Sequence, residues 1–281
     1  MSESLRILTQ KIPKLPTLPP VAEKIIHLVN SKAAFIGSIV ETIEKDAAIS
    51  AKIIGFSNAA LYRRGDPVTT IRDAVMKIGF DNVKSVALGI SLLTLFKSER
   101  GEEPRDYRNI ISHSLVTGLI AKELVDMLKW RDHGEVFTCG LLHDVGMLVM
   151  SAYFPDIYSQ VLLKFKEGKV FLEAEKEVFG FSHGDIGAWL ADKWMLPEAI
   201  YDVIRFHHCP AKAALNPSMA AVIHVSDFVC AKNNYSPVSG KGYEDGFDRA
   251  ALKMLGLNEQ DLMKLSSKVG EIAGPMEGIL A

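Results

Sequence analysis

The chain has 281 residues, 48% of them hydrophobic and 23% charged, a composition typical of a folded domain and not of a disordered chain. Lys and Arg number 32 against 34 Asp and Glu, so a formal charge of −2 shows no evident nucleic-acid-binding character. No apolar run reaches the length of a membrane span and MSESLRILTQK lacks a signal-peptide pattern, so we expect a cytoplasmic protein without a membrane partner.

Apolar residues recur at helical spacing along almost the whole chain, and convincing period-two alternation is hard to find. The sequence therefore predicts an all-α fold, and it contains no evident internal repeat. In the N-terminal part we expect helices from Pro20, over 36–45, over 47–57, through PVTTIRDAVMKIG with Gly79 at its C-terminal cap, and over 83–96 with Asp81 as its N-terminal cap.

The charged segment SERGEEPRD, residues 98–106, interrupts this pattern, so we place a boundary between two packed helical lobes there, 1–97 and 98–281. The polar stretch 233–246 is rich in turn formers and long enough to be a mobile flap over a site. The helices of the second lobe are expected over 108–128, 135–152, 155–167, 171–180, 183–195, 197–208, 217–232 and, as a final pair, 247–272.

Histidines of the second lobe fall on the apolar faces of predicted helices. His113, His183 and His207 each continue an apolar stripe, so their imidazoles should face the interior. His208 follows at the end of its helix, just before Pro210 stops it. The last turn of a helix presents unpaired carbonyl groups and partial negative charge, which suit a cation held by two terminal imidazoles.

Two carboxylates join these histidines. Asp227 lies in MAAVIHVSDFVCA, which offers no other formally charged residue, and a buried carboxylate needs a partner. GLLHDVGMLVM places His143 beside Asp144 in another apolar helix, where Asp144 could bridge two cations, and Gly146 permits a neighbouring backbone to approach closely.

Taken singly, each of these residues is more simply a hydrogen-bonded core residue, but together they form an ordered set along one lobe. Cys139, Cys209 and Cys230 lie far apart without CxxC spacing, which argues against a disulfide framework and a thiolate zinc site. The metal ligands we predict are therefore His113, His143, Asp144, His183, His207, His208 and Asp227.

The order of His113, His143–Asp144 and Asp227 resembles the HD superfamily of metal-dependent phosphohydrolases, and His183 with His207–His208 matches the extended ligand set of its HD-GYP branch. In the N-terminal half, LPTLPPVAEKI, EKDAAISAKIIGFSNAALYRR and TIRDAVMKIGFDNVKSVALGI resemble the start of an HDOD domain, expected from about Lys11 to about Phe228. The resemblance implies a bacterial signal-transduction protein of the HDOD type.

Nitrogen and oxygen ligands without thiolate suit iron, manganese or zinc, and seven ligands around a shared carboxylate suit two metal ions. Two such ions can hold a phosphoryl oxygen and activate water for attack on a phosphate ester. However, HD-GYP phosphodiesterases carry a lysine at the position of Met147, and HHCPAKAALNP lacks the GYP element, so hydrolysis of cyclic dinucleotides is poorly supported.

Three interpretations stay open at this point. In the first, the chain is a regulatory module that keeps the metal centre and binds signalling proteins, or a nucleotide or other phosphate-containing ligand, with negligible turnover. In the second, it is an active metal-dependent phosphodiesterase or nucleotide phosphohydrolase. In the third, it is a metal-free helical scaffold in which the same residues form a buried hydrogen-bond network. Metal analysis coupled to a phosphodiesterase screen distinguishes the three.

Overall fold

The computed structural model describes residues 3–12, 18–31, 36–58, 66–96, 106–130, 135–239 and 242–273. Within these ranges the regular elements are helices and no strand occurs, which confirms the all-α prediction. The N-terminal elements are α1 (Glu3–Thr9), α2 (Pro20–Ser31), α3 (Ile36–Glu44), α4 (Ala47–Ser57), α5 (Ile71–Ile78), α6 (Phe80–Leu93) and the 3-10 helix η2 (Thr94–Phe96).

A longer series of helices follows Asp106. In chain order its elements are α7 (Tyr107–Met127), α8 (Glu135–Leu142), α9 (Val145–Tyr153), α10 (Pro155–Lys166), α11 (Phe171–Phe179), α12 (His183–Lys193), α13 (Glu198–Phe206), η3 (Pro210–Lys212), α14 (Pro217–Lys232), η4 (Tyr243–Gly246), α15 (Ala250–Leu255) and α16 (Glu259–Ala273). These bounds agree with the predicted ones to within a few residues, apart from the stretch predicted as one helix over 135–152.

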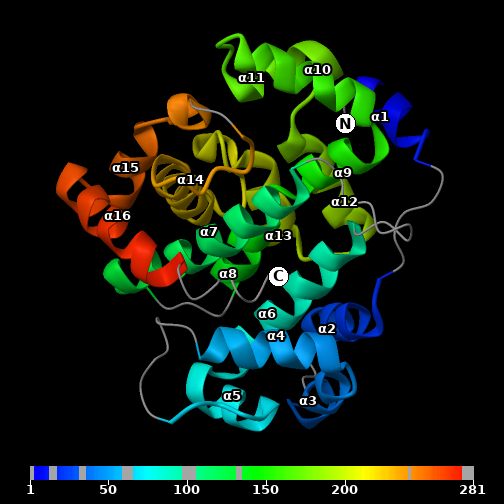
Figure 1. Cartoon of the computed structure of the whole chain (residues 1–281), viewed down its shortest axis with the longest axis vertical. Helices are drawn as coiled ribbons and strands as arrows, with labels where there is room; N and C mark the ends of the chain where they lie inside the picture. The colour runs from blue at the N-terminus through cyan, green and yellow to red at the C-terminus, as the bar shows by residue number, and fades with distance from the viewer. Residues whose placement is uncertain are drawn as a thin grey trace.

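The helix α6 connects two groups of helices. Helices α2–α5 form the lower group in Figure 1, and α7–α16 form the upper group. Helix α6 packs against α2, α4 and α5 and also against α8. At this last contact the side chain of Leu141 fills the space beside Gly89, where a Cβ would lie 2.9 Å from the Leu141 Cγ. Most of the predicted boundary segment lies outside the described residues, so the division into lobes at 97/98 stays a prediction.

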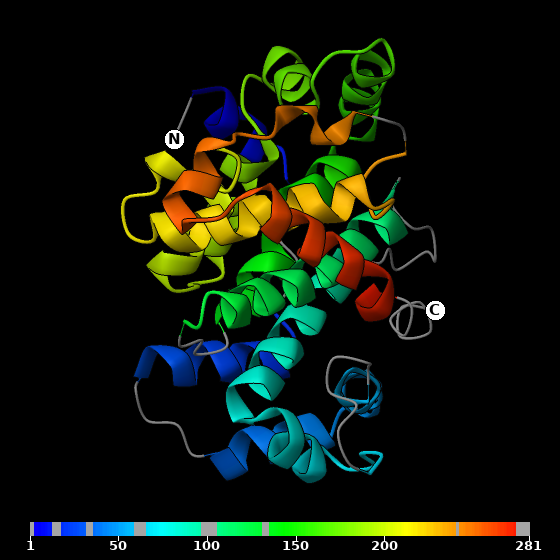
Figure 2. The ribbon, with the colours of Figure 1, turned by 90° about the vertical axis from the view of Figure 1, so that its left-hand side faces the viewer.

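The helix α1, which we did not predict, lies with the upper group beside α12 (Figures 1 and 2). Leu5 is 4% exposed and lines a cleft of about 590 Å³ together with Trp189 and Leu196. A seven-residue helix is too short to be stable alone in water, so the burial of Leu5 holds α1 in place.

The turn between α5 and α6 is tighter than expected. Gly79 ends α5 with φ 84°, as predicted, because glycine adopts this left-handed region without strain. Helix α6 begins at once with Phe80, so the prediction that Asp81 caps a helix from 83 was wrong. Asp81 lies in the first turn instead, where its charge favours the helix N-terminus and pairs with Lys84 at 2.8 Å.

Helix α7 is the scaffold of the upper group. It is buried along most of its length, and α8, α9, α14 and α16 pack around it. Ile110, Leu119 and Leu124 are at most 1% exposed. Burial of each such side chain stabilises the fold by about 1.5–3 kcal/mol relative to an exposed one. Side chains carried by α7 are therefore held rigidly.

One described stretch, Glu135–Tyr153, is long and apolar enough by length and composition to cross a membrane. In this protein 89% of its most apolar window is buried against other helices. It is accordingly a core segment of the upper group, in which α8 packs against α7 and α9 packs against α12.

Candidate metal centre

The structure brings all seven candidate ligands together, although they come from separate parts of the chain. Their side chains are buried, apart from that of His208, which is half-buried. They are contributed by α7 (His113), the turn between α8 and α9 (His143, Asp144), the start of α12 (His183), the end of α13 (His207, His208) and α14 (Asp227).

The helix predicted over 135–152 is interrupted at His143 and Asp144, two of the candidate ligands. Helix α8 ends at Leu142 and α9 begins at Val145, with His143 and Asp144 in the turn between them. In an uninterrupted helix consecutive side chains point about 100° apart, so the break allows both to face one cluster. Asp144 stands at the N-cap of α9 but makes no capping hydrogen bond, which leaves its carboxylate free to turn inward.

Two local features place His183 opposite Asp144. Ser182 and Asp185 form a capping box, in which the Asp185 N–H donates to Ser182 Oγ at 3.3 Å and the Ser182 N–H donates to Asp185 Oδ2 at 3.2 Å. This cap starts α12 at His183. A Cβ on Gly146 would lie 2.7 Å from the His183 carbonyl carbon, so the lack of a side chain there lets α9 approach α12.

Four of the histidines are held in one tautomer by hydrogen bonds at Nδ1. The acceptors are backbone carbonyl or carboxylate oxygens, so Nδ1 must carry the hydrogen, and in the neutral ring Nε2 keeps its lone pair. The pairs are His113 with the Tyr235 carbonyl (2.6 Å), His143 with the Gly140 carbonyl (2.7 Å), His207 with the Ile204 carbonyl (2.8 Å) and His183 with Glu175 Oε2 (2.7 Å).

The Nε2 atoms of these rings converge. His113 and His143 face each other with 3.3 Å between their Nε2 atoms. The Nε2 atom of His183 lies 3.2 Å from that of His207 and 3.0 Å from that of His208. Two neutral rings that both donate through Nδ1 cannot hydrogen-bond through facing lone pairs. Such an approach is favourable only where a positive charge is shared between the rings.

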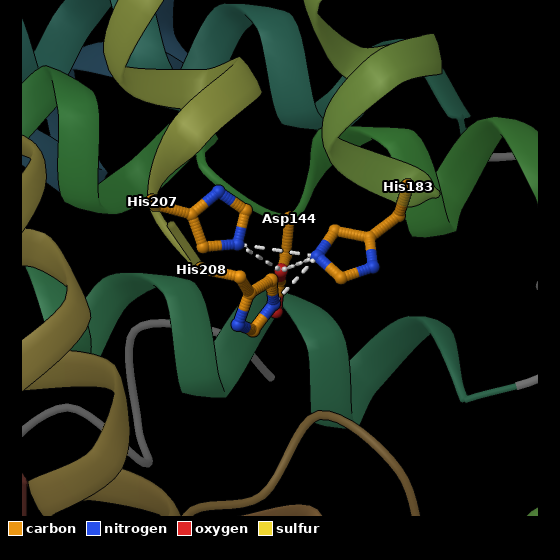
Figure 3. Close-up of side chains that lie close together, drawn as sticks. All are labelled: Asp144, His183, His207 and His208. Atoms are coloured by element: carbon orange, nitrogen blue, oxygen red, sulfur yellow. Dashed lines mark hydrogen bonds and ion pairs between the residues drawn. The ribbon is translucent and has the colours of Figure 1, made fainter. Parts of the chain in front are cut away.

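The carboxylate of Asp144 lies at the centre of the cluster, and Figure 3 shows the rings of His183, His207 and His208 directed at it. Its Oδ2 is 3.2 Å from His143 Nε2 and 3.5 Å from His113 Nε2, and its Oδ1 is 3.2 Å from His183 Nε2. These contacts are ion pairs only where an imidazole is protonated, and neither buried oxygen accepts a hydrogen bond from the residues that the structure describes. A buried carboxylate without a partner is costly, and a bound cation would satisfy it.

The donor atoms form overlapping groups that could hold a metal ion, with the atoms of each group within 4.8 Å of one another. Asp144 is common to two of them. All donors in these groups are imidazole nitrogens or carboxylate oxygens, a set that suits iron, manganese or zinc. The groups are Asp144 with His183, His207 and His208; His113 with His143 and Asp144; and His143 with His207 and Asp227.

The histidines of the cluster differ in their pKa: that of His207 is lowered and that of His183 is raised. Burial, aided by the neighbouring His143 and His183, lowers the pKa of His207 to about 3. Burial also lowers the pKa of His183, but Glu175 and Asp144 outweigh it and raise that pKa to about 9. His207 is therefore neutral at pH 7 and ready to act as a ligand, whereas His183 must give up a proton first.

Two further residues belong to the centre and were missed from the sequence. The first is Glu175, which is fully buried and accepts hydrogen bonds from both Nδ1 and the backbone N–H of His183. It continues the apolar stripe of Phe171, Ala174 and Phe179, at an offset of four from Phe171. A carboxylate in such a stripe is a signal that could have been used.

The second missed residue is Tyr243, in the segment 233–246 that was predicted to be a mobile flap. Its ring centroid lies 6.1 Å from that of His113 and 6.5 Å from that of His208. Tyr243 is 7% exposed and Val238 only 1%. Tyr243 thus places part of the segment over the cluster, as expected, while the mobility of the segment stays a prediction.

The fold and the site define an all-helical protein with a buried histidine and aspartate cluster that could hold metal. The HDOD domain family matches residues 15–210, well over half of the chain, and the chain belongs to this family. The matched range includes the candidate ligands from His113 to His208 and ends before Asp227.

Solved structures share this fold over 96% or more of the chain. An HDOD domain protein of unknown function from Geobacter sulfurreducens is 26% identical with a TM-score of 0.75, covering 96% of this chain and 97% of its own. A protein from Shewanella amazonensis, provisionally named a phosphohydrolase, is 23% identical with a TM-score of 0.76, covering 100% and 99%. The likeness to the second protein concerns the fold alone.

A relative among curated proteins is an uncharacterized protein of Treponema pallidum, 24% identical over 210 residues. The alignment covers 72% of this chain but 39% of that protein. The chain therefore spans about two fifths of the length of its relative.

Proposed function

We propose that the protein is an HDOD-type signal-transduction module that holds two metal ions and has little or no hydrolytic turnover. The observation that carries this proposal is the set of Nδ1 hydrogen bonds. In their neutral forms, His113, His143, His183 and His207 therefore direct Nε2 lone pairs toward the carboxylate of Asp144, which has no hydrogen-bond partner among the described residues. Imidazoles fixed in this way are a common arrangement of metal ligands in proteins.

In the proposed centre Asp144 bridges two ions, which we expect to be iron, manganese or zinc. We assign Asp227 to the same ion as His113, because its Oδ1 lies 3.1 Å from His113 Nε2. The proposed ligands are His113, His143, Asp144 and Asp227 for one ion, and Asp144, His183, His207 and His208 for the other.

Little turnover is expected because no positively charged side chain stands where HD-GYP phosphodiesterases carry a lysine. Met147, at the position where HD-GYP phosphodiesterases carry a lysine, is fully buried in α9 and supplies no charge. Tyr243 covers the imidazoles of His113 and His208. Bound metal ions would supply polarisation of a phosphoryl oxygen and of nearby water, which is the chemistry of the alternative function.

That alternative is an active metal-dependent phosphodiesterase or nucleotide phosphohydrolase. One observation favours it: the two ligand groups share Asp144, as in centres that bind both ends of a phosphoryl transfer. In either case we propose a cytoplasmic protein that binds a nucleotide or other phosphate-containing ligand, or signalling proteins, rather than nucleic acid or a membrane.

Metal analysis of the purified protein, coupled to a phosphodiesterase screen, tests the proposal. We expect two metal ions per chain and no metal-dependent release of product. Protein that stays metal-free after exposure to iron, manganese and zinc would contradict the proposal and leave the scaffold interpretation. Turnover that Asp144→Ala abolishes would establish the hydrolase instead.

Glu175→Gln should weaken metal binding while the fold persists. The amide keeps the size of the side chain, but the charge that fixes the tautomer of His183 and increases its basicity is lost. Loss of such a partner lowers metal affinity by about 10–100-fold. Competition against a chelator measures the change above pH 9, where a proton on His183 no longer competes with the metal in the wild type. Glu173→Gln, an exposed position in the same helix, is the matched control, and equal affinities of the two variants would contradict the assignment.

Metal affinity should rise between pH 7 and pH 9 and then level off. A proton occupies His183 below its pKa of about 9 and competes with the metal, so affinity grows about tenfold per pH unit for each proton displaced. The raised pKa of His143 acts in the same direction. His207, with its pKa of about 3, competes only in strong acid. Chelator competition at pH 7, 8 and 9 checks this slope, and a flat profile would rule it out.

A further inference from the structure

The hydroxyl of Tyr243 is a buried donor without an acceptor. Its oxygen is shielded from solvent and makes no hydrogen bond with any described residue. A tyrosine hydroxyl is neutral at pH 7, because its ordinary pKa is about 10, so the group can donate a hydrogen bond. An unpaired buried hydroxyl is costly, and an acceptor bound beside the ligand cluster would remove that cost.

The ring of Tyr243 is held in place on two sides. Phe171 packs against it with 5.5 Å between ring centroids, and the imidazoles of His113 and His208 lie at 6.1 and 6.5 Å. The phenol thus contacts both halves of the candidate centre, since these two histidines belong to different ligand groups. A donor in this position can serve a group bound across the centre.

Such a donor would complete the cluster as a binding site for an oxyanion. With metal ions bound, the inward-facing atoms of the candidate ligands hold the cations and cannot donate to a phosphate oxygen. The hydroxyl of Thr117, also at the cluster, lies 3.4 Å from His113 Nε2 and is directed at that ring. Met147 contributes neither a donor nor a charge. Oxygens of a bound phosphate that point away from the metal ions would therefore require a hydrogen-bond donor from the segment 233–246, which carries Tyr243.

We propose that Tyr243 is a ligand-binding residue of this centre, whose hydroxyl donates a hydrogen bond to a tetrahedral oxyanion, a phosphate group, held by the metal ions. The inference rests on the proposed function, since it requires the metal ions to be bound. It assigns to Tyr243 the recognition of the anion, whereas the seven candidate ligands hold the metal.

Tyr243→Phe tests this assignment, because it removes the hydroxyl and keeps the ring. Calorimetric titration of the metal-loaded protein with inorganic phosphate should show affinity about tenfold weaker than in the wild type, the effect of one lost hydrogen bond. Without phosphate, the same variant should unfold about 3 °C higher, because an unpartnered buried hydroxyl has been removed. A purely structural tyrosine would not give these opposite changes.

Tyr201→Phe is the matched control, since its hydroxyl accepts from Arg205 in a cleft away from the candidate ligands, and it should leave phosphate affinity unchanged. Unaltered phosphate affinity in Tyr243→Phe would overturn the inference. So would a visible absorption band of the iron-loaded protein that Tyr243→Phe removes, because the oxygen would then be bound to metal. Failure of the wild type to bind metal would instead refute the proposed function itself.

Discussion

Asp144→Asn is expected to strip the protein of at least one of its two metal ions. The carboxylate lies within 3.8 Å of the Nε2 atoms of His113, His143, His183 and His207, and no other described residue donates a hydrogen bond to its oxygens. Asparagine keeps the shape but offers one acceptor oxygen and no charge, so it cannot bridge two cations. We expect affinity to fall by more than about 100-fold, beyond the effect of a residue that only supports a ligand.

The measurement is the metal content per chain after extensive dialysis, compared between wild type and variant at equal helicity by circular dichroism. Asp156→Asn, an exposed carboxylate in α10, serves as the control and should retain the wild-type content. A full complement of two ions in Asp144→Asn would refute the bridging role.

Gly146→Ala is expected to destabilise the protein by about 3 kcal/mol, the upper range for overpacking. The added methyl group would overlap the backbone carbonyl of His183, which cannot move without shifting α12. This result would be opposite to the usual gain of up to about 1 kcal/mol when alanine replaces glycine in a helix. Because the conflict involves His183 itself, metal content should fall as well.

Urea denaturation of the two proteins measures the free energy of unfolding. Gly270→Ala is a matched control on α16, where nothing lies within 4 Å of the added group, and it should stabilise the protein slightly. Equal stabilities of the two variants would mean that α9 and α12 can separate at no cost, and the argument from close approach would fail.

Much of this fold could be predicted because helical periodicity persists through most of the chain. The bounds of α7, α12 and α14 follow the apolar stripes closely. The break at His143–Asp144 could not be predicted in this way, because the apolar pattern continues through it and tertiary contacts decide the geometry. Helix α1 was also missed, since its short amphipathic pattern gains stability only when Leu5 is buried.

The candidate site was predictable where its polar or charged residues interrupt the apolar face of a predicted helix. A charged Asp227 in an apolar helix and a histidine on the buried face of α7 are visible in the sequence. Tyr243 lies in a segment without periodicity, so only the three-dimensional structure places it over the cluster. Glu175 could have been found by the same reasoning as Asp227, because it lies on the apolar face of α11.

The packing of Leu141 against Gly89 joins the candidate centre mechanically to the N-terminal helices. Leu141 precedes His143 by two residues, and α6, which carries Gly89, also packs against α2, α4 and α5. Because interiors are densely packed, a side chain larger than glycine at position 89 would press on the segment that carries His143. The N-terminal helices are thus in packing contact, through α6, with the segment that positions two of the candidate ligands.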